Sequence, residues 1–222
     1  MNIGENDLQR KQNAILFIET AREMIEAEGI DQVSVRKIAD KAGFHNSTIY
    51  LYFEDLDELL MLASIKYFRE YSESLEHLSN QAQSPTKNFL AIWDLFNRSI
   101  FRKPKVFYNF FFGKRSQNLK EILNLYYDIL FPEERHRFSA EIETMYFGNN
   151  LKERSLRILR PLIEEETAVT EENLDMINEI TISCVKYKLE QKCQDDHLKV
   201  DRLVKELQEI LIYTCGIPKE LL

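Results

Sequence analysis

The sequence contains few of the residues that interrupt helices, with six glycines and five prolines among 222 residues. Between them, apolar residues recur mostly at every third or fourth position, which is the period of an amphipathic helix and not of a strand. Pro85, Pro104 and Pro132 stand where a helix can begin without losing an internal hydrogen bond. The pattern therefore predicts an all-α protein.

Long apolar runs are also missing, because charged residues interrupt every apolar segment before the roughly 18 residues that a membrane-spanning helix needs. The N-terminus has no basic and apolar leader segment. The three cysteines, Cys184, Cys193 and Cys215, show no close paired spacing, which does not fit a disulfide framework. We therefore expect a cytoplasmic protein with free thiols and no membrane partner.

The chain has fewer positive than negative residues. It contains 29 lysines and arginines and 37 aspartates and glutamates, which gives a net charge of -8. Such a chain is not expected to coat nucleic acid or an anionic membrane along its whole surface, because that kind of binding needs a basic field. A local basic face is still compatible with this balance. The length of 222 residues allows one large helical domain, or a small domain followed by a larger one.

Sequence signatures of catalysis and metal binding are absent as well. The chain has no phosphate-cradling glycine loop, no HExxH motif and no serine-centred elbow. Glu133 and His136 form one Glu-x-x-His pair, whereas a di-iron bundle needs two such pairs. Cys193 and His197 lack the second pair of ligands that a zinc site requires. We therefore expect no catalytic residue, no metal and no cofactor.

Glycine and proline positions divide the helical pattern into separate elements. Gly29 ends the first helix, and Pro161 lies inside a later one, which it should kink or split. No internal repeat or low-complexity linker is present. The predicted helices span Leu8–Glu28, Val35–Ala42, Ser47–Phe53, Asp57–Leu78, Thr86–Phe101, Pro104–Phe112, Asn118–Leu130, Glu133–Tyr146, Leu151–Glu165, Glu171–Lys192 and Leu198–Tyr213.

The segment "KIADKAGFHNSTIYLYF", residues 37–53, predicts two short helices that meet at a sharp turn. Ser34 precedes the first of them and can accept a hydrogen bond from an amide of the first turn, as an N-cap does. Gly43 ends this helix, where a left-handed backbone conformation is often needed. Asn46 can cap the second helix, in which Ile49 and Phe53 share one face.

This segment has the arrangement of a helix-turn-helix: a helix, a turn that contains glycine, and a short second helix with polar and aromatic residues on its outer side. Proteins with this motif place the second helix in the major groove of DNA. The alternative without a DNA-binding function is that two short helices meet at a glycine, as happens in many helical proteins. The position of positive charge favours DNA binding. We expect Arg36, Lys37 and Lys41 on the exposed face of the preceding helix, with Arg10 and Lys11 near the start of the first helix, while most acidic residues of this region lie elsewhere.

From Phe17 to Leu60 the sequence resembles the DNA-binding domain of the tetracycline-repressor (TetR/AcrR) family. The resemblance rests on Ala21, Met24, Ile25 and Gly29, followed by "VSVRKIADKAGFHNSTIYLYFEDLDELL". The rest of the chain is similar to the family only in being helical and of suitable length. The resemblance implies a helix-turn-helix domain in residues 1–53 and a larger helical domain for ligand binding and dimerisation in residues 54–222.

The same resemblance implies roles for individual residues. Arg36 should reach a base edge or a phosphate, Lys37 and Lys41 should contact phosphates, and the start of the second helix should enter the major groove. Tyr50 and Tyr52 should touch the backbone and flanking bases. The DNA-contacting residues implied in this way are Arg36, Lys37, Lys41, Asn46, Ser47, Thr48, Tyr50, Leu51 and Tyr52.

The sequence departs from the family pattern at two positions. Leu56 replaces a lysine that commonly grips a phosphate, and it lies among acidic residues that would repel the DNA backbone. We therefore expect fewer ionic contacts with DNA than is usual for the family. His45 replaces a small hydroxyl residue at the turn, so we expect Asn46 to cap the second helix and that helix to start one residue later.

The last two long helices carry apolar stripes that can pair with those of a second chain in a four-helix interface, as the family resemblance implies. The stripes can equally pack within their own chain, and the period alone does not distinguish the two. The residues expected at a dimer interface are Ile177, Ile180, Cys184, Leu203, Leu207 and Ile210.

The stretch "VFYNFFF", Val106 to Phe112, is apolar on nearly all sides and must be buried on several of them. Together with other aromatic residues it can line a pocket for a small apolar or aromatic molecule. The alternative is that these aromatic residues simply form core. The pocket hypothesis includes Trp93, Phe96, Phe107, Phe110, Phe111, Tyr126 and Tyr127.

These observations lead to the hypothesis of a ligand-responsive transcriptional regulator. It would bind a palindrome in double-stranded DNA as a homodimer, most simply as a repressor, and a small apolar or aromatic effector would release it. The alternative is a helical small-molecule or protein-binding module whose helix-turn-helix no longer reads DNA, which the acidic balance of the N-terminal domain favours.

Overall fold

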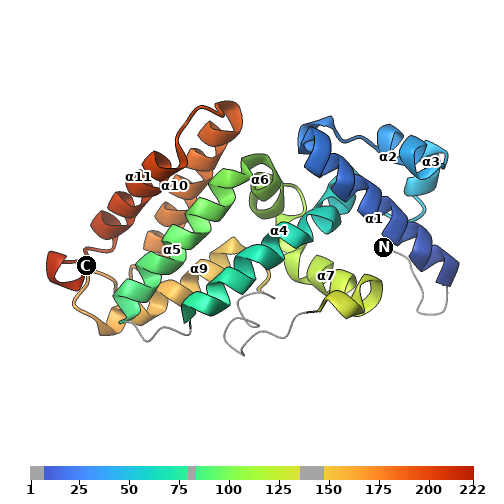
Figure 1. The fold of residues 1–222 in the computed structure, drawn as a ribbon. Coiled ribbons are helices and arrows are strands. Elements are labelled where there is room, and N and C mark those ends of the chain that lie inside the picture. The colour runs from blue at the N-terminus through green and yellow to red at the C-terminus, as the bar shows by residue number, and fades with distance from the viewer. Residues whose placement is uncertain (1–7, 80–83, 136–147) are drawn as a thin grey trace.

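The computed structural model describes residues 8–79, 84–135 and 148–222. Within these ranges the regular structure is helical, without a strand, and the all-α prediction is confirmed. Figure 1 shows an elongated arrangement in which the first three helices lie at one end, and helices α5, α10 and α11 lie at the other. Helix α4 runs between the two ends.

The N-terminal unit forms around helix α1, which packs against both α2 and α4. Its core consists of side chains from all three of its helices and the following turn, among them Phe17, Ile38, Ile49 and Phe53, which are almost completely buried. Ile49 and Phe53 therefore share the inward face, as the sequence predicts. The helices of this unit are α1 (Leu8–Glu28), α2 (Val35–Ala42) and α3 (Asn46–Ile49).

Local caps fix the bend between α2 and α3. The Ser34 hydroxyl accepts a hydrogen bond from the Lys37 amide at 3.3 Å, at the start of α2. Gly43 ends α2 with φ at 79°, a left-handed conformation that costs a residue with a Cβ about 1–2 kcal/mol. Both sequence predictions are confirmed.

The cap of α3 differs from the prediction. His45, and not Asn46, is the N-cap, because its Nδ1 accepts a hydrogen bond from the Ser47 amide at 3.3 Å. The same nitrogen lies 2.8 Å from the Ser47 hydroxyl. An imidazole nitrogen thus takes the place of the small hydroxyl that this position usually carries, and Asn46 becomes the first residue of the helix.

The remaining helices form the larger part of the molecule. Helix α10 packs on α6, α9 and α11, while α5 packs on α4 and α11 (Figure 1). Their apolar faces join those of the N-terminal unit in one continuous core. The helices are α4 (Leu56–Ser79), α5 (Pro85–Arg102), α6 (Pro104–Phe112), α7 (Leu119–Asn124), α9 (Leu151–Leu159), α10 (Leu174–Gln194) and α11 (Val200–Thr214).

Two predicted helices are interrupted. The helix expected over Asn118–Leu130 consists of α7 and a π-helix over Leu125–Leu130. Helix α9 ends at Leu159, and a 3₁₀ segment that contains Pro161, Arg160–Glu164, follows this helix. The predicted split at this proline is therefore confirmed. The proline lacks the amide hydrogen that an α-helix would need there.

Two other predicted helices differ from the structure in their described residues. The second helix of the helix-turn-helix ends at Ile49 and not at Phe53, because the chain continues as a turn over residues 50–52. Of the helix expected over Glu133–Tyr146, most lies outside the described residues, and its described beginning is a 3₁₀ turn, Pro132–Glu134.

Ion pairs connect the start of α4 to the loop after α6. The Asp55 carboxylate accepts hydrogen bonds from Lys114 Nζ at 2.6 Å and Arg115 Nη2 at 2.8 Å. Arg115 also pairs with Glu54 at 2.7 Å. At the other end of α6, Lys105 pairs with Asp31, which lies in the 3₁₀ turn η1 (Ile30–Gln32) before α2. The start of α6 is therefore attached to the N-terminal unit, and the loop after α6 is attached to the start of α4.

The environment of Asp55 favours its charged form. Burial alone would raise the pKa of this carboxyl, but hydrogen bonds from Arg115, Lys114 and the Glu58 amide outweigh burial and hold the pKa well below its usual 3.8. A group whose pKa is lowered in the folded state stabilises that state above its unfolded pKa, and the contribution is lost as the pH falls.

We predict that Asp55→Asn lowers the free energy of unfolding at pH 7 by about 1–2 kcal/mol, because Lys114 and Arg115 lose a charged acceptor. The difference from the unsubstituted protein should shrink as the pH falls through about 4 toward 3, where Asp55 itself begins to protonate in the unfolded chain. Urea unfolding across this pH range measures it. Asp57→Asn, in the same helical turn but without an ion pair to a described residue, is the control; an equal loss there, or a pH-independent difference, would contradict the prediction.

Candidate DNA-binding surface and ligand cavity

Helix α3 presents several of the predicted DNA contacts to solvent. Asn46 and Ser47 are exposed at its start, and Thr48 is half-buried. Tyr50, in the turn that follows, is 58% exposed, and Leu51 is exposed beside it. Large apolar and aromatic side chains this exposed on a short helix and its turn are available to a partner.

Tyr52 corrects the prediction. Its side chain is 8% exposed, and its ring packs 5.5 Å from that of Phe17. Its hydroxyl accepts a hydrogen bond from Asn13 Nδ2 at 2.9 Å. The chain leaves the α3 helix after Ile49, and the turn directs Tyr52 toward α1. Tyr52 therefore attaches α3 to α1 and is not part of the exposed surface.

The basic residues of α2 behave differently from one another. Arg36 is 84% exposed, with Asp40 at 3.8 Å. Lys37 Nζ donates to Glu28 at 3.1 Å and to the Gln32 carbonyl at 2.9 Å. Arg36 is thus the predicted cation that extends furthest into solvent.

Lys41 pairs with Glu23 of α1 at 3.0 Å. The expected separation of acidic and basic residues is therefore wrong, because the acids of α1 reach the lysines of α2. The partners are about half-exposed or more, and exposed ion pairs contribute only about 0–1 kcal/mol. A phosphate can replace such a carboxylate at little cost.

Arg10 was not assigned to the site from the sequence, where it is only one of two basic residues near the start of the first helix. In the structure its Nη2 donates to the Leu51 carbonyl at 3.0 Å, and its guanidinium lies 6.0 Å from the Tyr52 ring. This contact spans 41 positions in sequence, so a local motif gives no sign of it. It brings a cation to the exposed end of α3.

Leu56, at the position of the family's usual lysine, is half-buried and packs against the core. Its acidic neighbours Glu54 and Asp55 are bound by Arg115 and Lys114. Two of the acids that were expected to repel DNA, Glu54 and Asp55, are therefore compensated by cations from the loop after α6.

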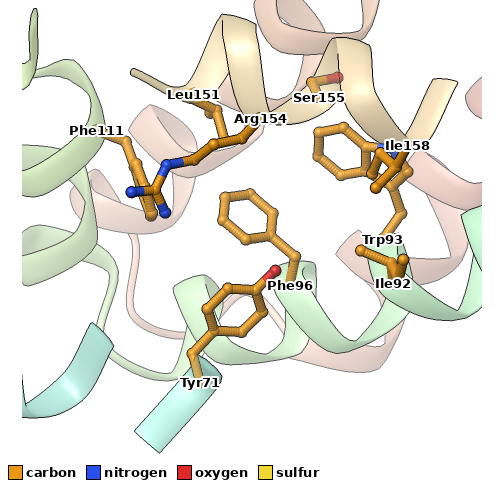
Figure 2. Close-up of a pocket in the computed structure, with 9 residues that line it drawn as sticks. All are labelled: Tyr71, Ile92, Trp93, Phe96, Phe111, Leu151, Arg154, Ser155 and Ile158. Carbon is orange, nitrogen blue, oxygen red and sulfur yellow. The ribbon is translucent and has the colours of Figure 1, made fainter. Parts of the chain in front are cut away.

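The aromatic residues divide between a cavity and the core. Trp93 and Phe96 of α5 and Phe111 of α6 line a cavity of about 30 Å³, which Tyr71 of α4 and residues of α9 complete (Figure 2). A space of this size holds about two water molecules. Phe107 stacks on Phe111, with ring centroids 6.0 Å apart, and belongs to the core behind the wall.

Three further predicted pocket residues do not line this cavity. Phe110 packs 4.9 Å from Phe68 in the core. Tyr126 accepts a hydrogen bond from Arg22 at 2.6 Å and donates to Glu134 at 2.7 Å, in a cluster between α1 and the π-helix. Tyr127 is buried beside it, 4.9 Å between ring centroids. Their inclusion in the pocket is therefore wrong for this structure, since the hydrogen bonds of Tyr126 turn it toward α1.

Arg154 of α9 is the cavity residue that sequence reasoning missed. It is 6% exposed, its guanidinium lies 4.5 Å from the Phe68 ring, and its Nη2 donates to the Gly148 carbonyl at 3.3 Å. A sequence signal existed, because Leu151, Arg154 and Ile158 share one helical face, and an arginine on an apolar face is unusual. Figure 2 shows Arg154 extending from α9 toward Phe111.

The expected dimer residues also divide into two groups. Ile177, Leu203 and Leu207 are buried within their own chain. The prediction that they lie at a dimer interface is therefore wrong, and they pack internally, as the alternative stated. Cys184 and Ile210 are half-buried. Ile180 is 40% exposed. The exposed large apolar and aromatic residues of α10 and α11 are Met176, Ile180, Tyr187 and Tyr213.

Met176, Ile180 and Tyr187 lie four and seven positions apart, which places them on one face of α10. Within the described ranges, no cluster of three or more His, Cys, Asp and Glu side chains is arranged to hold a metal ion. No helix in the same ranges is long and apolar enough to cross a membrane.

Comparison with known proteins addresses the N-terminal unit and the whole fold separately. Residues 17–61 match the family model described as bacterial regulatory proteins of the tetR family. This match covers α1 from Phe17 onward, α2, α3 and the start of α4. No curated protein sequence matches the chain.

Solved structures with a similar fold cover nearly the whole chain. RolR in complex with resorcinol is 16% identical, with a TM-score of 0.58, and the match covers 95% of this chain and 96% of RolR. Thermus thermophilus FadR, a TetR-family transcriptional repressor in complex with lauroyl-CoA, is 14% identical, with a TM-score of 0.58 and coverage of 93% and 96%. Bacillus subtilis FadR in complex with stearoyl-CoA is 18% identical, with a TM-score of 0.54 and coverage of 92% and 99%.

The two comparisons agree with the geometry. The family match falls on the unit that exposes α3, and the structural likeness extends over the cavity and over α10 and α11. The chain therefore carries the DNA-binding domain of the TetR family in residues 17–61 and has the fold of TetR/AcrR-family transcriptional regulators.

Proposed function

We propose that this chain is a transcriptional repressor that binds a palindromic operator as a homodimer and is released by a small apolar or aromatic effector. The observation that carries the proposal is the exposed start of α3, held in place by the His45 cap and Gly43, within the segment that matches the TetR family. The exposed polar side chains of Asn46 and Ser47 then face base edges, and Tyr50 faces the DNA backbone.

Helix α6 supplies a route by which an effector would act on DNA binding. Its residue Phe111 lines the cavity, while Lys105 and the loop residue Arg115 attach its two ends to Asp31 and Asp55. A ligand that moves Phe111 would move α6 and, through these pairs, the N-terminal unit. Such a ligand lowers DNA affinity if it binds better to the moved state.

The relatives in complex with resorcinol, lauroyl-CoA and stearoyl-CoA support an effector with an apolar or aromatic body. The rival function is a helical binding module that does not read DNA. The pairing of Lys37 and Lys41 with acids of α1 favours this rival, because it reduces the positive field near α3.

We predict that Tyr50→Ala weakens operator binding about tenfold or more, because it removes an exposed side chain at the DNA-facing end of α3. Tyr50→Phe, which removes only the hydroxyl, should cause a smaller loss. Quantitative footprinting on DNA flanking the protein's own gene measures both. Lys205→Ala, which removes an exposed cation of α11, should leave the affinity unchanged. A folded protein with no sequence-specific binding at low salt would overturn the proposal in favour of its rival.

A second prediction concerns the acids that pair with α2. Glu23→Gln combined with Glu28→Gln should release Lys41 and Lys37 for phosphate contact, raising DNA affinity about two- to tenfold and steepening its dependence on salt by about one to two contacts per subunit. Titration at several salt concentrations measures the slope. The control is Glu26→Gln, since Glu26 pairs with Lys66 of α4 at 2.9 Å and not with α2. The same change in slope in the control would contradict the prediction.

A third prediction tests the dimer. The exposed face of α10 that contains Ile180 should pair with the same face of a second chain, so that Ile180→Asp raises the dimer dissociation constant at least about tenfold. Leu16→Asp on α1 is the matched control, because Leu16 is 42% exposed and Ile180 is 40% exposed. Analytical ultracentrifugation distinguishes the two. Unchanged dimerisation of Ile180→Asp would show that another surface makes the dimer.

A further inference from the structure

The N-cap of α3 is a side chain that can gain a proton near neutral pH. His45 Nδ1 accepts a hydrogen bond from the Ser47 amide at 3.3 Å, and the same nitrogen lies 2.8 Å from the Ser47 hydroxyl. In most helices the capping atom is an oxygen of serine, threonine, asparagine or aspartate. A hydroxyl or carboxamide cap does not titrate, whereas a histidine side chain ordinarily changes its charge between about pH 5 and 8.

The hydrogen bonds of His45 fix the tautomer of its neutral ring. A backbone amide can only donate, so Nδ1 must carry the lone pair and the ring proton must lie on Nε2. The Ser47 hydroxyl then also has to donate to Nδ1, which leaves the hydroxyl oxygen as an acceptor. One nitrogen lone pair therefore holds both the amide and the hydroxyl of Ser47.

Protonation of the ring removes this lone pair. An imidazolium has a hydrogen on each nitrogen and accepts no hydrogen bond, so the Ser47 amide loses its acceptor and the Ser47 hydroxyl must change from donating to accepting. Helix α3 has only four residues, Asn46–Ile49, so the capping bond is a large part of the hydrogen bonding that orders its start. Loss of this bond therefore loosens the start of the helix.

The charged groups around His45 are engaged elsewhere. Helix α2 packs against α3, and its charged side chains are Arg36, Lys37, Asp40 and Lys41. These four side chains form ion pairs with one another or with acids of α1. Arg10 donates to the Leu51 carbonyl at the other end of α3. Within the described residues, the His45 ring forms hydrogen bonds with Ser47 alone, so its protonation acts first on the cap.

We infer that His45 is a positioning residue for DNA recognition, and that only its neutral form holds the start of α3 and the Ser47 hydroxyl in the arrangement that binds DNA. Protonation releases both, so operator binding weakens as the pH falls. The capped state binds one proton fewer than the uncapped state and is therefore favoured as the pH rises. The DNA-binding part of the inference rests on the proposed function, whereas the titrating cap does not.

The expected size of the effect follows from the fraction of molecules in which α3 is ordered. An apparent dissociation constant rises in proportion as the binding-competent fraction falls. The usual effect of losing an N-cap corresponds to about two- to thirtyfold in such an equilibrium. An imidazolium that paired with a phosphate would act in the opposite direction, because it would tighten binding and steepen the dependence on salt.

The first test measures operator affinity from pH 8 to about pH 5.5 at constant ionic strength. We expect binding about three- to tenfold weaker at the lower pH, without a steeper dependence on salt. His45→Ser keeps a capping oxygen that does not titrate, so this variant should lose the pH dependence. Equal pH dependence in His45→Ser, or binding that tightens as the pH falls, overturns the inference.

Further variants separate the cap from other effects of pH. His45→Ala removes the cap at every pH, so at pH 8 it should bind DNA about threefold or more weakly than His45→Ser. Ser47→Ala keeps the backbone amide, so its binding should still weaken as the pH falls. His77→Gln, in the last turn of α4, should keep the pH dependence of the unsubstituted protein. Equal affinities of His45→Ala and His45→Ser at pH 8 overturn the inference.

Nuclear magnetic resonance of the full-length protein tests the cap without DNA. At pH 8 the His45 ring should carry its proton on Nε2, and the Ser47 amide should exchange with solvent faster once the ring is protonated. A proton on Nδ1 at pH 8 overturns the inference. A titrating cap in a protein that recognises no operator would support the cap and overturn the proposed function. Operator binding that does not change with pH would overturn the inference and leave the proposed function in place.

Discussion

Helix α6 is attached near its start to the turn before α2, the loop that follows it is attached to the start of α4, and Phe111 near its C-terminal end forms part of the cavity wall. Lys105 pairs with Asp31 before α2, and Arg115 pairs with Asp55 at the start of α4. Phe111 lies between these two attachments. Because interiors are close-packed, a displaced Phe111 would press on the side chains around it and on α6 itself. Helix α6 in turn contacts both the turn before α2 and helix α4, on which α1 packs.

The DNA-facing surface is built so that an acidic chain can still bind a polyanion. The ion pairs of Lys37 and Lys41 with α1 are exposed, and pairs of this kind are worth little. Under the proposed function these pairs would be exchanged for pairs with phosphates when DNA binds. Arg10 donates a hydrogen bond to the Leu51 carbonyl and so lies at the exposed end of α3. The net charge of the whole chain thus says little about this one surface.

The sequence predicted the parts of the structure that local rules determine. Ser34 and Gly43 act where capping and left-handed geometry require them, and the helical period located most helices within a few residues. Local rules failed where distant contacts decide. The Tyr52 side chain points toward α1, where Asn13 donates a hydrogen bond to its hydroxyl. The Tyr126 side chain lies outside the cavity, where Arg22 donates a hydrogen bond to its hydroxyl. In the same way, helical spacing could not tell which apolar stripe of α10 and α11 packs within the chain.

The cavity wall and the attachment of α6 have a joint energetic consequence. Two buried polar donors of the wall, Trp93 Nε1 and Ser155 Oγ, have no protein partner in the described chain, and a buried donor without a partner costs about 1–3 kcal/mol. A ligand that satisfies them recovers that free energy, and part of it is available to shift α6 against its ion pairs. A ligand shifts a conformational equilibrium only by its difference in affinity for the two states. Because ligand sites usually measure about 300–1,000 Å³ and this cavity measures about 30 Å³, an effector of the proposed kind would have to favour a state in which the wall side chains have moved.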